Sequence, residues 1–90
     1  MAYFITCIDK KNSLKKRLSI RSRHLKYLEK FRPYLITAGP LIDENKEIYG
    51  SLLVMDFKNF SQVNSFLQND PYNKDDLFKE IIIKEFKKVF

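Results

Sequence analysis

Two stretches of this 90-residue chain are apolar at consecutive positions, where a strand with one solvated face would alternate apolar and polar side chains. One is Leu52-Leu53-Val54-Met55, and the other is Ile81-Ile82-Ile83. Strands with apolar side chains on both faces need a covering layer on each side of their sheet. The chain is therefore limited to folds or assemblies that bury both faces of a sheet.

Two further strands are predicted from apolar segments bounded by turn residues. Tyr3 to Ile8 alternates between two mostly apolar faces, and the segment from Tyr34 to Ala38 ends at Gly39-Pro40. A polar loop is expected between the two middle strands, at 42–49. The four predicted strands span 3–8, 34–38, 51–57 and 78–86, and a basic, aromatic tail follows at 86–90.

Two amphipathic helices are predicted between these strands. The first follows a cap at Asn12 or Ser13 and ends at Arg32-Pro33, because proline disfavours helical geometry in the residue before it. Arg21 falls where the apolar stripe needs an apolar residue, so a break is expected at 19–22, with the basic side chains outside the stripe. The stripe consists of Leu14, Leu18, Leu25, Leu28 and Phe31.

The second helix carries a clearer local signal. Asn59 and Gln62 have the spacing of a capping box, and Asp70-Pro71 ends the helix. A polar bridge at 73–76 then leads to the last strand. The apolar stripe of this helix consists of Phe60, Val63, Phe66 and Leu67.

The resulting order, β-α-β-β-α-β, is that of a ferredoxin-like α+β fold, with an antiparallel sheet and both helices on one face. Residues 1–90 are expected to form a single domain, because a chain of this length has room for one core. Burial of the second face of the sheet is worth roughly 25 cal/mol per Å² of apolar area. We therefore expect a second copy of the sheet to cover it, in a homodimer of the dimeric α/β barrel type.

The composition argues against several classes of protein. No apolar run reaches the roughly 18 residues of a membrane span. The first residues enter a strand pattern without the basic start of a secretory signal, so a cytoplasmic protein is expected. One cysteine, Cys7, and one histidine are too few for a zinc site. No carboxylate cluster, phosphate loop or dinucleotide fingerprint predicts another metal or a cofactor.

The formal net charge of +6 comes mainly from basic residues between positions 10 and 26. A basic surface can attract nucleic acid. The chain lacks an RNP-like aromatic signature, zinc-finger spacing and a helix-turn-helix, so no nucleic-acid partner is expected. Two interpretations of the charge remain, namely a solvated helical face and attraction of a small anionic molecule.

His24, the only histidine, borders the apolar stripe of the first helix, one turn before Leu28. An imidazole can give or take a proton near neutral pH, so a partly sheltered ring is a candidate general acid or base. The alternative is a histidine that only packs at the edge of a helix. His24 is therefore a candidate catalytic residue whose role depends on what lies beside it.

Asp70 precedes Pro71 and Tyr72 at the end of the second helix. Acidic residues at such positions commonly bond nearby backbone amides, and this local role is one interpretation. A carboxylate at a helix C-terminus also meets the negative end of the helix dipole, which favours a compensating partner such as His24. Spacing alone leaves both interpretations open.

The ends of the two middle strands carry candidates for ligand binding. Gly39-Pro40 and Gly50 flank the connecting loop, where glycine permits close approach of a ligand, although an ordinary turn uses the same residues. Thr37 and Ser51 can donate hydrogen bonds, but neither has a base beside it that predicts a serine nucleophile. The candidate substrate-binding residues are Thr37, Gly39, Ser51 and Tyr72.

Several segments, taken in order along the whole chain, carry a family resemblance. They are Lys16-Arg17-Leu18-Ser19, His24-Leu25, residues 35–40, Gly50-Ser51, Asp70-Pro71-Tyr72 and the tail at 84–90. With these segments the chain resembles the YciI-like proteins of the YCII-related domain family. The resemblance implies a dimeric ferredoxin-like fold and a site centred on a histidine and an aspartate, at the positions of His24 and Asp70. The chain departs from the family in a short loop at 41–49 and in Ser22, where a proline often begins the helix.

The resemblance also implies a class of reaction. The family resembles muconolactone-isomerase-type dimeric barrels, and some relatives act on chlorinated aromatic breakdown products. We therefore expect a lyase- or isomerase-type enzyme without a cofactor, in which His24 moves a proton on a small, anionic metabolite and Asp70 orients the ring. The alternatives are a non-catalytic protein that binds a small molecule and a dimeric accessory or interaction module.

Overall fold

The computed structural model describes residues 2–90, which form a four-stranded sheet and three α-helices. In chain order the elements are β1 (Ala2–Asp9), α1 (Leu14–Lys30), a 3-10 turn (Arg32–Tyr34), β2 (Leu35–Ile42), β3 (Ile48–Met55), α2 (Phe60–Asn69), α3 (Pro71–Lys74) and β4 (Phe78–Phe86). The strand order is β2-β3-β1-β4, and every neighbouring pair is antiparallel. The predicted α+β fold is confirmed, with α3 as an additional short helix.

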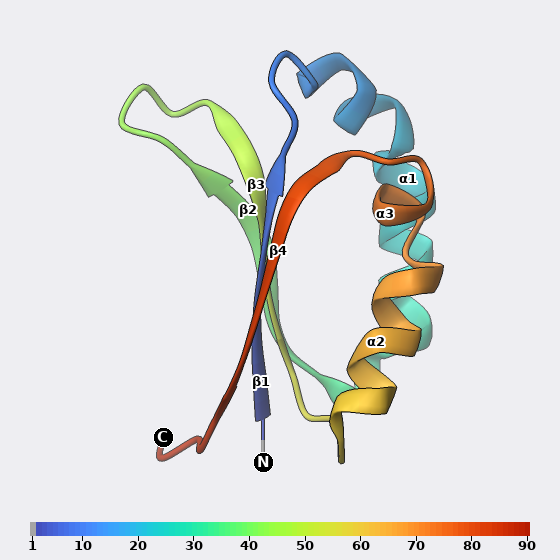
Figure 1. The fold of residues 1–90 in the computed structure, drawn as a ribbon, viewed down its shortest axis with the longest axis vertical. Coiled ribbons are helices and arrows are strands. Elements are labelled where there is room, and N and C mark those ends of the chain that lie inside the picture. The colour runs from blue at the N-terminus through green and yellow to red at the C-terminus, as the bar shows by residue number, and fades with distance from the viewer. Residues whose placement is uncertain (1) are drawn as a thin grey trace.

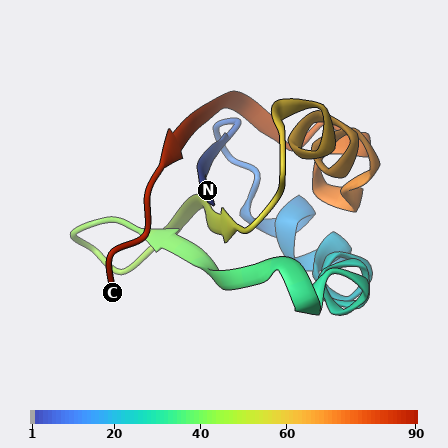
Figure 2. The ribbon, with the colours of Figure 1, turned by 90° about the horizontal axis from the view of Figure 1, so that it is seen from below.

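All three helices lie on one face of the sheet, and the opposite face is bare (Figures 1 and 2). On the helix side of β1, the side chains of Tyr3, Ile5 and Cys7 are buried. On the bare side, Phe4 and Ile82 expose 38% and 40% of their surface. The alternation predicted for β1 is thus confirmed, and nothing within residues 2–90 covers the second, largely apolar face.

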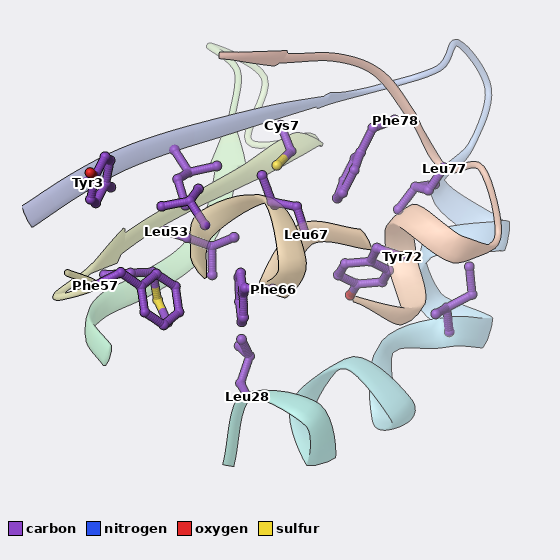
Figure 3. Close-up of a cluster of buried hydrophobic side chains, with 14 residues drawn as sticks. Tyr3, Cys7, Leu28, Leu53, Phe57, Phe66, Leu67, Tyr72, Leu77 and Phe78 are labelled. Carbon is purple, nitrogen blue, oxygen red and sulfur yellow. The ribbon is translucent and has the colours of Figure 1, made fainter. Parts of the chain in front are cut away.

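The core lies between the sheet and the helices (Figure 3). Aromatic rings join the two long helices, because Phe31 at the end of α1 meets Phe66 of α2 edge to face, with ring centroids 4.9 Å apart. Leu53 and Met55 of β3 are buried beneath them. This packing holds α1 at a fixed distance from the sheet. It thereby also places the side chains that α1 buries nearer its start.

Helix α1 runs without a break, so the interruption expected at 19–22 is absent. Leu14, Leu18 and Leu25, which were predicted to face the core, are 47%, 55% and 43% exposed. The residues that α1 buries are Arg17, Ile20, His24 and Leu28. The helix can turn this face inward because the polar groups of Arg17 and His24 find partners in the interior, which an apolar stripe does not reveal.

The hairpin of β2 and β3 is longer than predicted. Pro40 lies within β2, opposite Ser51, rather than ending the strand. An edge strand tolerates proline because one side of its backbone needs no ladder hydrogen bonds. Gly50 lies inside β3, where an added Cβ would be 2.3 Å from the carbonyl oxygen of Cys7. Only glycine therefore lets β3 approach β1 here, and this approach fixes the neighbouring Ser51.

The second helix begins and ends as predicted. The Asn59 side chain accepts a hydrogen bond from the backbone N–H of Gln62, as the capping box requires. Phe60 is the member of its apolar stripe that stays exposed. Asp70 ends α2 and at once begins α3, so part of the polar bridge expected at 73–76 is helical. Asp70 thus stands at the junction of two helices.

Candidate active site

His24 and Asp70 are hydrogen-bonded within one chain. Nδ1 of His24 lies 2.8 Å from Oδ1 of Asp70, and the two side chains are 8% and 0% exposed. A carboxylate only accepts hydrogen bonds, so Nδ1 carries the proton when Asp70 is ionised. Nε2 of the neutral ring then holds a free lone pair.

The backbone around Asp70 fixes the carboxylate. Its Oδ1 also accepts a hydrogen bond from the backbone N–H of Tyr72, at 3.0 Å, which caps α3. Oδ2 is the one buried side-chain nitrogen or oxygen of residues 2–90 that has no hydrogen-bond partner. The local capping role and the role as partner of His24 therefore coexist on a single oxygen.

The ring of Tyr72 packs against two groups of α1. It stacks on the imidazole of His24 with ring centroids 4.0 Å apart, and the guanidinium carbon of Arg17 lies 4.6 Å from its centre. Arg17 and His24 are seven residues apart, or about 10.5 Å along a helix, so the tyrosine ring fills the space between them. Figure 3 shows this side chain extending from α3 towards α1. Tyr72 thereby restrains the orientation of both neighbours.

Arg17 is a buried cation that reasoning from the sequence placed outside the core. Its Nε and Nη2 donate to the two carboxylate oxygens of Asp9, at 2.7 and 3.1 Å, and Nη2 also donates to Oγ of Ser51 at 2.6 Å. The Arg17 and Asp9 side chains are 5% and 6% exposed. One signal was available, because Arg17 precedes Ile20 by three residues and His24 by seven, which is the spacing of one helix face.

A cavity of about 270 Å³ lies between α1 and the hairpin of β2 and β3. Four of the predicted site residues line it, namely His24, Gly39, Ser51 and Tyr72. Asp70 stands behind His24 and does not line the cavity. Thr37 pairs with Val54 and is not brought to the cavity either. The rest of the wall is largely apolar, apart from Arg17 and Arg21.

Among the buried residues that line this cavity, three polar atoms have no hydrogen-bond partner in the described part of the chain and remain free to meet a ligand. They are Nε2 of His24, the hydroxyl of Tyr72 and Nη1 of Arg17, none of which has a hydrogen bond to residues 2–90. Among residues 2–90, Asp70 Oδ2 is the only fully buried side-chain nitrogen or oxygen without a hydrogen-bond partner. Each of the three unpaired atoms is therefore partly exposed. Because their residues are otherwise buried and line the cavity, the cavity is where these atoms are reached.

Two groups near the site have raised pKa values. Burial raises the pKa of the Tyr72 hydroxyl, and the positive charges of Arg17 and Arg21 partly oppose this rise. The hydroxyl is therefore protonated at neutral pH and able to donate. Burial, followed by the negative charge of Asp70, raises the pKa of Cys7 to about 12. Cys7 is consequently an inert thiol beneath the site rather than a nucleophile.

Within residues 2–90, no three side chains of His, Cys, Asp or Glu come together as metal ligands. Over the same stretch, no helix combines the length and the apolar character needed to cross a bilayer. What the cavity offers a ligand is one imidazole, several hydrogen-bond donors and an apolar wall.

Comparison with known sequences yields a family and close relatives. The model of the YCII-related domain matches residues 1–87. An uncharacterised protein of Haemophilus influenzae is 36% identical over 98 aligned positions, and protein YciI of Escherichia coli is 35% identical over 98. Both alignments cover 100% of this chain and 100% of the relative.

Solved structures show the same arrangement of elements. The 5-chloro-2-hydroxyhydroquinone dehydrochlorinase of Burkholderia phenoliruptrix, in complex with 2,5-dihydroxybenzoquinone, matches with a TM-score of 0.90 and 32% identity. The match covers 97% of this chain and 94% of that one. A conserved protein of Methanosarcina mazei matches with a TM-score of 0.63 at 11% identity, over 97% and 94% of the two chains, which shows the fold alone.

Proposed function

Since the chain belongs to the YCII-related domain family, we propose that it is a small enzyme that transfers protons on a small, anionic metabolite. His24 is its general acid and base, and Asp70 orients His24. One observation carries the proposal: a buried carboxylate holds Nδ1 of His24, while Nε2 is free at the cavity. An oriented, sheltered imidazole with one free nitrogen is suited to general acid–base catalysis.

In the proposed reaction, Nε2 of neutral His24 removes a proton from the substrate. Asp70 then stabilises the imidazolium through the Nδ1–H hydrogen bond. Return of the proton to a different carbon completes an isomerisation, whereas departure of a leaving group with its electron pair completes an elimination. The same residues thus serve isomerase- and lyase-type chemistry.

The charges around the cavity support an anionic substrate. Arg21 lines the cavity and has no ion pair among residues 2–90. No carboxylate of these residues lines it, and the whole chain has a formal net charge of +6. A cleft with one sign of charge raises the local concentration of ligands of the opposite sign. The apolar remainder of the wall suits a carbon skeleton.

The dehydrochlorinase described above supports the class of reaction. Loss of hydrogen chloride from a substrate combines removal of a proton with departure of a leaving group. We extend to this chain that class of chemistry rather than the particular chlorinated substrate. The similarity of the two folds, with a TM-score of 0.90 at 32% identity, is the basis for this extension.

We also propose that the protein is a homodimer in which the bare sheet faces pack together. Phe4 and Ile82 leave apolar surface exposed on that face, and burial of such surface favours association by roughly 25 cal/mol per Å². Sedimentation at micromolar concentration should give a species of twice the chain mass. A Phe4→Lys variant should sediment as a monomer, while Leu18→Lys, exposed on α1, should remain dimeric.

The enzymatic proposal is tested with His24→Gln, which keeps a polar side chain of similar reach. Two assays cover the two reaction types: chloride release from 5-chloro-2-hydroxyhydroquinone, and incorporation of deuterium from D2O into small anionic carbonyl compounds, followed by NMR. His24→Gln should lower the rate of whichever reaction the wild type catalyses by about 10²- to 10⁴-fold. Lys26→Gln, on the exposed side of α1, is the matched control.

If the protein binds these compounds but turns none of them over in either assay, the proposed enzyme is refuted and the non-catalytic binding protein is supported. The pair itself has a separate test, because 15N NMR of the single histidine reports which ring nitrogen carries the proton. We expect Nδ1–H in the wild type and a change in the tautomer ratio in Asp70→Asn. An identical spectrum in that variant would contradict the assigned role of Asp70.

A further inference from the structure

The ion pair with Asp9 does not use all the donors of Arg17. Nε and Nη2 donate to Asp9 and Ser51, whereas Nη1 has no partner among residues 2–90 and is not fully buried. The Arg17 side chain is only 5% exposed and lines the cavity. The two N–H groups of Nη1 are therefore available to a ligand in the cavity.

Ser51 presents a second donor beside the first. Its Oγ accepts the N–H of Arg17 Nη2 at 2.6 Å and donates to no atom of residues 2–90. A hydroxyl that accepts from a guanidinium keeps its own proton for another acceptor. Because Ser51 also lines the cavity, an oxygen atom of a ligand is the acceptor that this arrangement lacks.

We infer that Arg17 and Ser51 form an oxyanion-binding site, which holds the negative charge that develops on a carbonyl oxygen when His24 removes a proton from the adjacent carbon. This inference rests on the proposed function. It narrows the substrate to a small carbonyl compound that has a C–H bond next to the carbonyl group.

The spacing of the groups suits such a substrate. The centre of the Tyr72 ring is 4.0 Å from the imidazole centre of His24 and 4.6 Å from the guanidinium carbon of Arg17. The imidazole centre and the guanidinium carbon can therefore be no farther apart than the sum of these two distances. A substrate on the cavity side of the Tyr72 ring, with its carbonyl oxygen about 3 Å from Arg17 and the neighbouring carbon about 3 Å from His24, fits within that limit.

Asp9 makes Arg17 suitable for binding a charge that appears during the reaction. The two-hydrogen-bond pair fixes the guanidinium before a ligand arrives, and donors that need no reorganisation stabilise a developing oxyanion best. Arg21 is different, because it is exposed and unpaired among the described residues. Arg21 attracts anions from solution, whereas Arg17 and Ser51 recognise one oxygen atom.

The proton transfer balances without an additional reactant. The C–H bond breaks, and its proton moves to Nε2 of His24. The electron pair of that bond forms a carbon–carbon double bond, and the π pair of the carbonyl group moves to the oxygen, giving an enolate. Nη1 of Arg17 and the hydroxyl of Ser51 donate hydrogen bonds to that oxygen. Where a double bond is conjugated with the enolate, return of the proton to the far carbon of that double bond restores the carbonyl group. Loss of a leaving group, with its electron pair, from the carbon next to the α carbon also restores it.

The test uses the anion of cyclohexane-1,3-dione, a stable enolate at neutral pH, with neutral cyclohexanone as the matched ligand without an oxyanion. Ser51→Ala removes one donor and keeps the Arg17–Asp9 pair, so the fold is retained. Arg17→Lys keeps the charge but removes Nη1. By calorimetry, each variant should bind the enolate about 10- to 100-fold more weakly, as for a hydrogen bond to a charged group. Cyclohexanone affinity should not change, and Ser19→Ala, an exposed serine of α1, should match the wild type.

Each outcome decides between the two proposals. Equal enolate affinity in the wild type, Ser51→Ala and Arg17→Lys overturns the oxyanion site, as does an absence of enolate binding by the folded wild type. His24→Gln should lose proton exchange and keep enolate affinity. His24-dependent exchange with an unaffected Ser51→Ala refutes the oxyanion site alone. Enolate binding that depends on Ser51, without any His24-dependent exchange, supports the oxyanion site and refutes the proposed enzyme.

Discussion

The two buried side-chain pairs on α1 lie against the same tyrosine ring and differ in whether the charge of the α1 residue can change. Arg17 and Asp9 share two hydrogen bonds, and arginine stays protonated at any ordinary pH. His24 and Asp70 share one, of 2.8 Å, and an imidazole gains and loses a proton near neutral pH. We call Arg17–Asp9 the fixed pair, because the charge of its arginine does not change. We call His24–Asp70 the switchable pair, because its histidine can gain or lose a charge.

The difference separates stability from reactivity on a single helix face. Both carboxylate oxygens of Asp9 have partners, whereas Oδ2 of Asp70 is buried without one. A buried unpaired oxygen costs free energy of folding, and such exceptions are expected where chemistry needs them. In the proposed reaction, the carboxylate of Asp70 favours the imidazolium that the proton transfer creates. Loss of the fixed pair should therefore mainly lower the free energy of unfolding, and loss of the switchable pair should mainly slow the proposed proton transfer.

The largest expected effect is on stability, in Arg17→Ala. The substitution leaves the carboxylate of Asp9 buried and unpaired, and breaking a buried pair in this way costs about 3–5 kcal/mol of unfolding free energy. Urea denaturation measures it. Arg23→Ala, which breaks the solvent-exposed pair with Asp75, is the control and should leave the midpoint nearly unchanged. If the urea midpoints of the two variants are similar, the Arg17–Asp9 pair does not stabilise the fold more than a surface pair, and its assignment as the structural pair is wrong.

Asp70→Asn should show the opposite balance. The amide oxygen can still accept the backbone N–H of Tyr72, so the cost in unfolding free energy should be about 1–2 kcal/mol, less than for Arg17→Ala. The amide no longer holds Nδ1–H of His24 with a charge, so proton exchange should fall about 100-fold or more. Urea denaturation and deuterium incorporation, measured on one preparation, give both numbers. A loss of stability greater than that of Arg17→Ala would reverse the assignment.

Local signals made part of this structure predictable. The alternation of Tyr3 to Ile8 identified β1, and the Asn59 side chain, which caps its own helix, marked the start of α2. The switchable pair was also within reach, because a lone histidine and an aspartate before proline each have a recognisable chemistry. Their contact joins α1 to the start of α3, 46 residues away, and no spacing rule encodes such a distance.

The fixed pair was missed because its partners come from two strands. From the sequence alone, an arginine is predicted to lie on the surface. Only the fold shows that Asp9 and Ser51 accept its hydrogen bonds in the interior. The inward face of α1 was misassigned for the same reason, since the exposed leucines formed a plausible stripe of their own. The sequence predicts that β2 ends at Gly39-Pro40, because the edge position of that strand, which tolerates proline, depends on the whole sheet.

A smaller effect is expected at Tyr72, the ring that both pairs share. Tyr72→Phe keeps the ring contacts with Arg17 and His24 and removes a hydroxyl that has no partner among residues 2–90, so the unfolding free energy should change by less than about 0.5 kcal/mol. Tyr72→Leu also removes the ring and should cost about 0.5–1.5 kcal/mol more for each lost contact. Equal stabilities for the two variants would mean that the ring does not hold the pairs together.

The smallest effect concerns Cys7, a buried thiol whose pKa responds to both pairs. Burial and the charge of Asp70 raise this pKa to about 12, while the two members of the fixed pair act in opposite directions, Arg17 lowering it and Asp9 raising it. Asp70→Asn should lower the pKa of Cys7 and increase the thiolate fraction. Alkylation by iodoacetamide at mildly alkaline pH should then speed up several-fold more than the lower unfolding free energy of the variant accounts for. Mass spectrometry follows the reaction, and Asp75→Asn, at the far end of α3, is the control. A rate that follows the loss of stability alone would show that burial, and not the charge of Asp70, governs the thiol.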